Sequence, residues 1–113
     1  MPVTHTIRLK CYEILLGCYR HLQNHEMFMS SYKNMLEYVQ FVFGDVSYMI
    51  KLCCLLGQYL KSRGNAQEAL EVYEEAVRLA QKLENKDEEV SLYIDMNNIH
   101  LESINASDAR NIL

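Results

Sequence analysis

Three side chains in the N-terminal quarter of the chain are of types that bind transition metals: Cys18, His21 and His25. On one continuous helix, a spacing of three and then four residues would direct them to one face, where they could ligate zinc. The helical pattern that contains Cys18 and His21 ends near Gln23, which separates His25 from them. We therefore favour their interpretation as ordinary helix residues and predict no metal site and no cofactor.

Sequence motifs of enzymes are also missing. There is no serine at a nucleophile elbow, no glycine-rich phosphate loop and no HExxH zinc motif. The acidic runs Glu74-Glu75 and Asp87-Glu88-Glu89 are interpreted as solvated helix faces and caps. His5 and His100 stand alone in the sequence and are interpreted as surface residues. We therefore predict that the protein is not an enzyme.

Composition limits the class of partner. The length of 113 residues suits one domain, and the formal net charge of −4 argues against nucleic acid or an anionic membrane as the main partner. The eight tyrosines could stack on RNA bases, but the 11 lysines and arginines are scattered and form no basic stripe, so core packing is the favoured interpretation. We find no apolar run long enough for a transmembrane helix and no secretory signal at the N-terminus.

The four cysteines lie within apolar helical patterns, at Cys11, Cys18, Cys53 and Cys54. We interpret them as reduced thiols of a cytoplasmic protein, with a disulfide framework as the alternative.

The apolar positions recur with a period near 3.6 residues, and the only proline is Pro2, so long helices are expected. The helices are predicted at residues 6–23, 27–43, 46–63, 66–84 and from about 87 to Ser103, with a short sixth from about residue 107. Asn65 is expected to cap the fourth helix through its side chain, with Gly64 in a left-handed conformation before it. Asn85 repeats this logic for the fifth helix.

An internal repeat accompanies these helices. The pattern Leu-Leu-Gly-X-Tyr occurs at residues 15–19 and again at 55–59, which places Gly17 forty residues before Gly57. Tyr32 and Tyr73 are expected at equivalent places in the second and fourth helices, with one residue lost from the first loop. Self-similarity at such a period is typical of stacked helix pairs.

The second repeat resembles the tetratricopeptide repeat family. Leu56-Gly57 and Leu60 match its first helix, and Gly64 matches its turn. On the second helix the matching residues are Ala69, Tyr73, Ala76 and Leu79, whereas Gln81 stands where the family commonly has proline. The first repeat is a weaker match because Phe28 and Met35 stand where small residues are expected. The period of about forty residues is similar to the longer-helix variants of the family.

The resemblance implies an all-α fold: a right-handed α-solenoid of antiparallel helix pairs, with about two and a half repeats in a single domain, residues 1–113. The repeats would cover residues 6–43, 46–84 and, in part, 87–113. Gly57 and Ala69 would let two helices approach closely where they cross, Tyr73 and Leu60 would fill the space beside them, and Ala76 would let the next pair pack.

Members of this family bind proteins along a groove lined by the first helix of each repeat. The resemblance places ten partner-binding candidates there: Ile14, Cys18, His21, Lys51, Cys54, Gln58, Lys61, Ile94, Asp95 and Asn98. Some members clamp the acidic C-terminal tail of heat-shock chaperones with basic and amide groups. The matching positions here are Ile14, Cys18, Leu55, Ser91 and Asp95, none of them basic. We therefore expect an apolar or amphipathic partner segment and not a chaperone tail.

Two alternatives remain at this point. The fifth helix is expected to present an apolar face through Val90, Tyr93, Ile94 and Ile99, which a further part of a longer chain or a second copy in a homodimer could cover. The chain could otherwise be a structural subunit of a larger assembly, with its convex faces buried and no peptide in the groove.

Overall fold

The computed structural model describes residues 3–112, with the side chains of Phe43 and of residues 106–112 outside the description. This part of the chain is helical and contains no strand. None of its helices combines the length and the apolar character needed to cross a membrane. The chain divides into two compact units, Met1–Asp45 and Val46–Leu113, which are described in turn.

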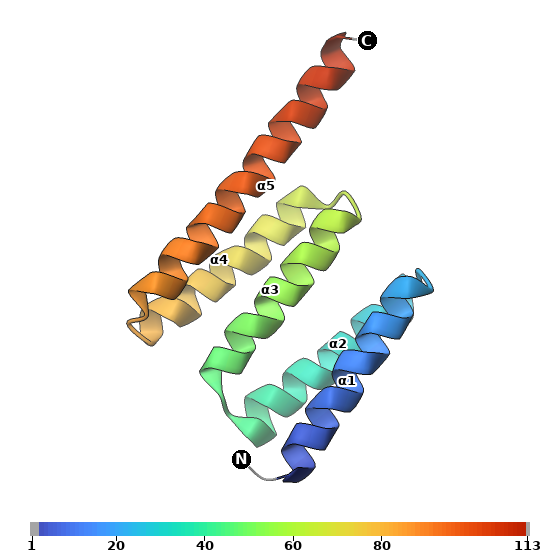
Figure 1. Cartoon of the computed structure of the whole chain (residues 1–113), viewed down its shortest axis with the longest axis vertical. Helices are drawn as coiled ribbons and strands as arrows, with labels where there is room; N and C mark the ends of the chain where they lie inside the picture. Colours follow the sequence, from blue (N-terminus) through green and yellow to red (C-terminus); the bar gives the residue numbers. More distant parts are fainter. Residues whose placement is uncertain (1–2, 113) are drawn as a thin grey trace. The chain divides into compact units, whose positions relative to one another are not determined.

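The first unit is an antiparallel helix pair, α1 (Val3–His21) and α2 (His25–Tyr38) (Figure 1). Leu9 and Leu16, two turns apart, form the buried face of α1, and Phe28, Tyr32 and Met35 form the core of α2. The chain continues from α2 into a π-helical turn, η1 (Val39–Phe43). Gly44 ends this turn in a left-handed conformation and donates its N–H to the carbonyl of Val39.

The second unit has three consecutive helices, α3 (Val46–Ser62), α4 (Ala66–Lys82) and α5 (Lys86–Ile112). The middle helix, α4, packs against both others. Figure 1 shows that α3 and α5 run in the same direction and that α4 runs opposite to both. Ala69 and Ala76 of α4 are fully buried, as are Leu92 and Ile99 of α5. The second unit therefore has three layers, each formed by one helix, with α4 in the middle.

The helices α3 and α4 are tightly packed at Gly57. A Cβ atom on this glycine would lie 2.6 Å from Cε2 of Tyr73, far inside van der Waals contact. The tyrosine ring cannot swing away because Tyr73 is only 1% exposed. The prediction that Gly57 permits a close helix crossing is confirmed.

The predicted equivalence of Gly17 and Gly57 is wrong. Gly17 is exposed, and a Cβ on it would meet nothing within 4 Å. The turns after α1 and α3 have the same length, so no residue is lost from the first loop, and Tyr32 and Tyr73 are 41 residues apart. This offset brings Leu16, which is buried, to the place of Gly57. The two copies of the Leu-Leu-Gly-X-Tyr motif are therefore one residue out of register in the structure, because the buried positions are set by the helix face and not by the motif.

Three turns share one backbone geometry. Gln23, Gly64 and Glu84 all have positive φ, at 56°, 83° and 54°. The N–H of the asparagine after each of them donates to a carbonyl five residues earlier, in Asn24 to Tyr19, Asn65 to Leu60 and Asn85 to Ala80. These are the bonds of the Schellman motif, which satisfies carbonyls at a helix end.

The asparagines then start the next helices in two ways. Asn24 Oδ1 accepts from the N–H of Met27, and Asn85 Oδ1 accepts from that of Glu88, each at 3.1 Å. The side chain of Asn65 makes no such bond, so its predicted capping role is wrong. The backbone carbonyls of all three asparagines accept from the N–H four residues later, and for Asn65 this bond from Ala69 starts α4 without a side-chain cap.

The predicted break between the fifth and sixth helices is also wrong, because α5 is continuous from Lys86 to Ile112. Its serines and asparagines after Ser103 lower helix propensity by only a few tenths of a kcal/mol each. No glycine or proline lies in this stretch, and such weak preferences do not end a helix. Leu113, the predicted end of the sixth helix, lies outside the described residues.

The helix crossing gives a matched pair of substitutions. Gly57→Ala should lower the free energy of unfolding by about 1–3 kcal/mol because the new methyl group overlaps the ring of Tyr73. Gly17→Ala should raise it by about 0.5–1 kcal/mol, because alanine favours a helix and the site is open. Urea unfolding monitored by circular dichroism measures both. A Gly57→Ala protein as stable as the Gly17→Ala protein would contradict the crossing described here.

The turns give a second pair. Glu84→Gly should stabilise the protein by about 0.5–1 kcal/mol, because glycine adopts a positive φ without the strain that a Cβ causes. Glu71→Gly, the same exchange in the interior of α4, should cost about 1 kcal/mol. Thermal unfolding of the two variants should therefore shift in opposite directions, and a shift in the same direction would argue against the turn geometry.

Candidate partner-binding groove

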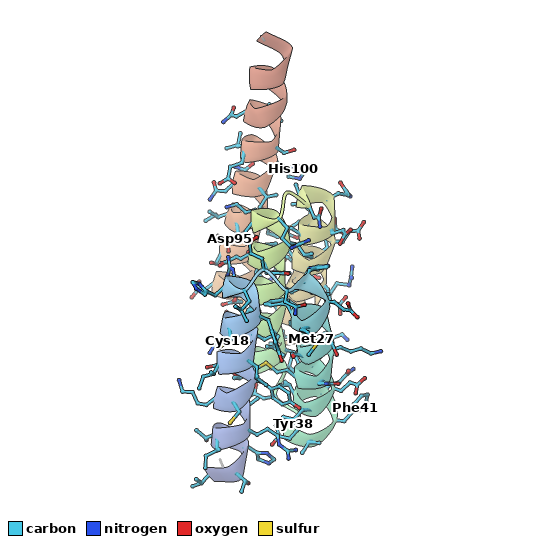
Figure 2. All side chains as sticks on the ribbon, turned by 90° about the vertical axis from the view of Figure 1, so that its right-hand side faces the viewer. Cys18, Met27, Tyr38, Phe41, Asp95 and His100 are labelled. Atoms are coloured by element: carbon cyan, nitrogen blue, oxygen red, sulfur yellow. The ribbon has the colours of Figure 1, made fainter. Side chains whose placement is uncertain are left out.

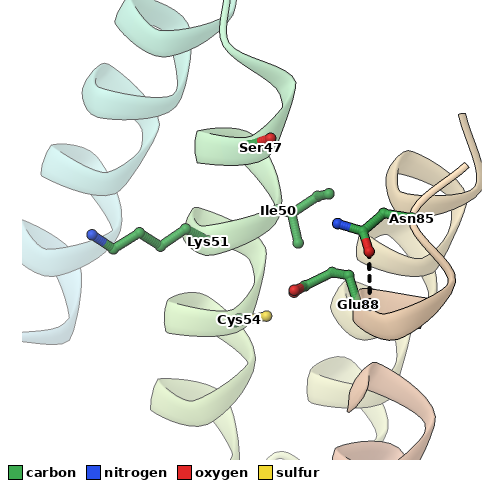
Figure 3. Close-up of a pocket in the computed structure, with 6 residues that line it drawn as sticks. All are labelled: Ser47, Ile50, Lys51, Cys54, Asn85 and Glu88. Carbon is green, nitrogen blue, oxygen red and sulfur yellow. Dashed lines mark hydrogen bonds between the residues drawn. The ribbon is translucent and has the colours of Figure 1, made fainter. Parts of the chain in front are cut away.

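A cavity of about 330 Å³ lies between α3 and the start of α5 (Figure 3). Its lining combines an aliphatic group, a thiol and groups of both charges: Ser47, Ile50, Lys51, Cys54, Asn85 and Glu88. The bond from the N–H of Glu88 to Asn85 Oδ1 fixes the first turn of α5 at the rim. In Figure 3 the Cys54 sulfur and the Glu88 side chain lie on facing sides of the cavity.

Two stripes of side chains extend from the cavity along α3 and α5. On α3 the stripe passes through Lys51, Cys54, Gln58 and Lys61, at the spacing of one helix face. On α5 the carboxylates Glu88, Asp95 and Glu102 recur every seven residues. The far ends of the stripes meet where the Lys61 Nζ lies 3.1 Å from the Glu102 Oε1. We call the region between the two stripes, from the cavity to the Lys61–Glu102 ion pair, the α3–α5 groove.

Burial and nearby carboxylates act together on the thiols beside the α3–α5 groove. The pKa of the Cys54 thiol is raised from 9.0 to about 12, first by burial and then by Glu88, Cys53 and Asp95. Burial and the Glu75 carboxylate raise the pKa of Cys53 to about 11. Both thiols are therefore protonated at neutral pH, and a neutral thiol is neither an effective nucleophile nor a metal ligand.

Tyr73 connects this region to the helix crossing. Its ring fills the space over Gly57, and a side-chain hydrogen bond joins its hydroxyl group to Gln58. Burial raises the pKa of Tyr73, and the neighbouring Cys54 and Asp95 raise it further. The residue that sets the spacing of α3 and α4 therefore also positions a polar group of the groove.

The structure places six of the ten predicted partner-binding residues along the α3 and α5 walls. Lys51 and Cys54 line the cavity, and Lys61 forms the ion pair with Glu102. Gln58 and Asn98 are exposed, and Asp95 is half-buried. Ile94 precedes Asp95 by one residue, a rotation of about 100° around α5, and so faces away from α4 and is exposed.

The remaining three candidates, Ile14, Cys18 and His21, are exposed on α1 in the first unit. His21 is the last residue of α1, whereas His25 begins α2 beyond the turn. Within residues 3–112 no three His, Cys, Asp or Glu side chains come together in a way that could hold a metal ion.

A second cavity, of about 570 Å³, opens in the first unit beside the N-terminal half of α1. Its lining is Thr4, His5, Ile7, Arg8, Cys11, Tyr38 and Val42. A ring nitrogen of His5 is hydrogen-bonded to the Tyr38 hydroxyl, and the Arg8 guanidinium lies 5.0 Å from the centre of the Tyr38 ring. Tyr38 points from α2 toward α1 (Figure 2). The interpretation of His5 as a solitary surface residue is wrong, whereas His100 is exposed.

Sequence reasoning missed the acidic wall of the groove. Glu88 was grouped with its neighbours as part of a solvated cap, although it lines the cavity. A signal was present, since Glu88 precedes Asp95 by seven residues and therefore shares its helix face.

Comparison with known proteins finds no family model, no curated protein and no solved structure that matches the chain. The groove is therefore interpreted from its own residues.

The perturbed thiols give a direct test. In the folded protein at pH 8, iodoacetamide should modify the exposed Cys18 at least ten times faster than Cys54, because little of the buried thiol is ionised. Peptide mass spectrometry over time measures the two rates, and in urea the rates should converge. Equal rates in the folded protein would show that Cys54 does not sit in the acidic, partly buried environment described here.

The same pKa shift has a consequence for stability. A folded-state pKa above the unfolded value favours the protonated folded protein, so the contribution is complete below pH 9 and is lost as the pH rises toward 12. The stability of Cys54→Ala should therefore fall less steeply above pH 9 than that of the unaltered chain.

Proposed function

We propose that the chain is a non-catalytic protein-interaction module that holds a segment of a partner protein in the α3–α5 groove. Its architecture is proposed to be a right-handed solenoid of the tetratricopeptide type. The support is the succession of antiparallel helices, the shared turn geometry of Gln23, Gly64 and Glu84, and the close crossing of Gly57 and Tyr73. Four free thiols, two of them exposed, support a reducing compartment, and we propose the cytoplasm.

The observation that carries the proposal is the pair of stripes on α3 and α5. Ile50 and Cys54 form the floor of the groove, and the regularly spaced carboxylates of α5 form one wall. A helix or extended segment with apolar side chains and a lysine or arginine complements these features. Such a basic group would lie near Glu88 and Asp95, the carboxylates that also disfavour the ionised form of the Cys54 thiol.

An acidic peptide tail is the least suitable occupant. A carboxylate in the groove would meet the same Glu88 and Asp95 charges that raise the pKa of Cys54. Lys61, the basic residue at the far end, is already paired with Glu102. We therefore propose that the groove does not hold the acidic tail of a heat-shock chaperone, nor the phosphate backbone of a nucleic acid.

The second candidate function is that of a structural subunit. It is favoured by large apolar side chains on the first unit, where Phe41 is 76% and Val42 is 59% exposed within the π-helical turn. Phe41 points outward from this turn (Figure 2). A cluster of exposed apolar side chains of this size is typical of a surface that contacts another protein.

Charge reversal in the groove distinguishes the two functions. Asp95→Lys should reduce the recovery of bound partner proteins from a cell lysate at least tenfold, because it places a positive charge where the partner's basic group would lie. Glu74→Lys makes the same change of charge on the exposed side of α4 and should leave recovery unchanged. Quantitative mass spectrometry of the captured proteins compares the variants, and circular dichroism checks that both are folded.

Two outcomes would overturn the groove proposal. If Asp95→Lys retains its partners and Phe41→Ser loses them, the structural-subunit function is the correct one. If a free peptide with the acidic chaperone tail binds the unaltered chain at micromolar concentration, the proposed groove chemistry is wrong.

A further inference from the structure

The outer face of α5 carries a regular apolar seam. Val90, Ile94, Leu101 and Ile104 are between 50% and 58% exposed. With Asn97 they follow one another at steps of four, three, four and three residues, the spacing of the core positions of a two-stranded coiled coil. We call these five residues the α5 seam.

The α5 seam points away from the rest of its unit. Leu92 and Ile99, which are buried at 1% and 3% exposure, are seven residues apart and hold α5 against α4. They occupy the side of the helix opposite the seam, so α5 is apolar on two faces. A helix that is apolar on two faces requires a neighbour on each. The predicted apolar face is confirmed at Val90, Tyr93 and Ile94 but is wrong at Ile99, which belongs to the α4 side.

Charge separates the α5 seam from the rest of the protein. The chain has a net charge of −4, and three of the acidic residues of α5, Glu88, Asp95 and Glu102, lie on the groove side. Between residues 91 and 105 the residues that flank the seam carry no formal charge when histidine is neutral: Ser91, Tyr93, Asn98, His100 and Asn105. One step before Val90 the same spacing reaches the charged Asp87, so the apolar seam begins at Val90. Such flanks do not repel an identical surface, and they offer nothing to attract an oppositely charged one.

Asn97 identifies the occupant. It is the only polar residue of the seam and lies at its centre, seven residues from both Val90 and Ile104. A foreign apolar helix would bury its amide without a hydrogen-bond partner, which is costly. By this spacing Ile94 and Leu101 take a positions, and Asn97 takes a d position of the heptad. In a parallel, in-register pair of identical helices each Asn97 shares a core layer with the other Asn97, where the two amides can bond to each other. We propose that the α5 seam is a self-association surface, and that its occupant is the same seam of a second copy in parallel register.

The interface leaves the proposed groove open, because the seam and the carboxylates are on different sides of α5. A seam of about four turns is small, below the roughly 1,200 Å² of standard interfaces, so we expect a weak dimer with a dissociation constant in the range of tens of micromolar. Association at this strength is detectable only in concentrated protein.

Sedimentation equilibrium of the whole chain, from about 5 to 500 μM, should show a monomer–dimer equilibrium in that range. Ile94→Glu should weaken association at least tenfold by placing a charge in the seam. Ile7→Glu introduces the same charge at an isoleucine on α1 of matching exposure, 57% against 56%, and should leave association unchanged. Asn97→Leu should tighten association, because it removes the one polar layer. A monomer at every concentration, or equal effects of Ile94→Glu and Ile7→Glu, would overturn the proposal.

Oxidative cross-linking tests the register. In a background with Cys11→Ser and Cys18→Ser, Val90→Cys and Ile104→Cys should each form a disulfide with an identical copy. A cross-link that forms only when the two variants are mixed would overturn the parallel arrangement in favour of an antiparallel one.

Discussion

The contact between Gly57 and the ring of Tyr73 sets the distance between α3 and α4, and the remainder of the second unit depends on it. The missing side chain at Gly57 lets the tyrosine ring lie against the α3 backbone, where any Cβ would overlap it. Ala69 and Ala76 are also fully buried, and their small side chains allow helices to pack closely on both sides of α4. Because α4 is the middle layer, its spacing from α3 decides how far α3 stands from α5, and so how wide the groove is.

The groove inherits its chemistry from this arrangement. Cys54 is half-buried beside the Tyr73 layer, and α5 brings Glu88 and Asp95 to its side. Burial and two carboxylates act in the same direction, so the thiol remains neutral and the surroundings favour a positive or hydrogen-bond-donating group. This environment supports the proposal that the groove binds a partner, because the same physical features that keep the cysteine unreactive favour a basic or hydrogen-bond-donating partner segment.

Parts of this structure could be predicted from the sequence because they depend on local rules. The 3.6-residue period of the apolar positions predicts the helices, and Gly64 predicts a left-handed turn. The spacing of Tyr32 and Tyr73 indicates the repeat. The rest depends on which face each helix buries. Gly17 repeats the letters of Gly57 but is rotated out of the core, and Glu88 resembles a cap residue until α3 is placed beside it. The hydrogen bond of His5 joins residues 33 positions apart, which no local pattern specifies.

The central claim is that Tyr73 is the reason why residue 57 must be glycine, and a double-mutant cycle tests it most directly. Gly57→Ala should destabilise the unaltered chain by about 1–3 kcal/mol. In a Tyr73→Ala background the ring is gone, so the same exchange should be neutral or stabilising by up to about 1 kcal/mol, the helix preference of alanine over glycine. A coupling energy of more than about 1 kcal/mol between the two positions is therefore predicted. Equal costs of Gly57→Ala in both backgrounds would contradict the account.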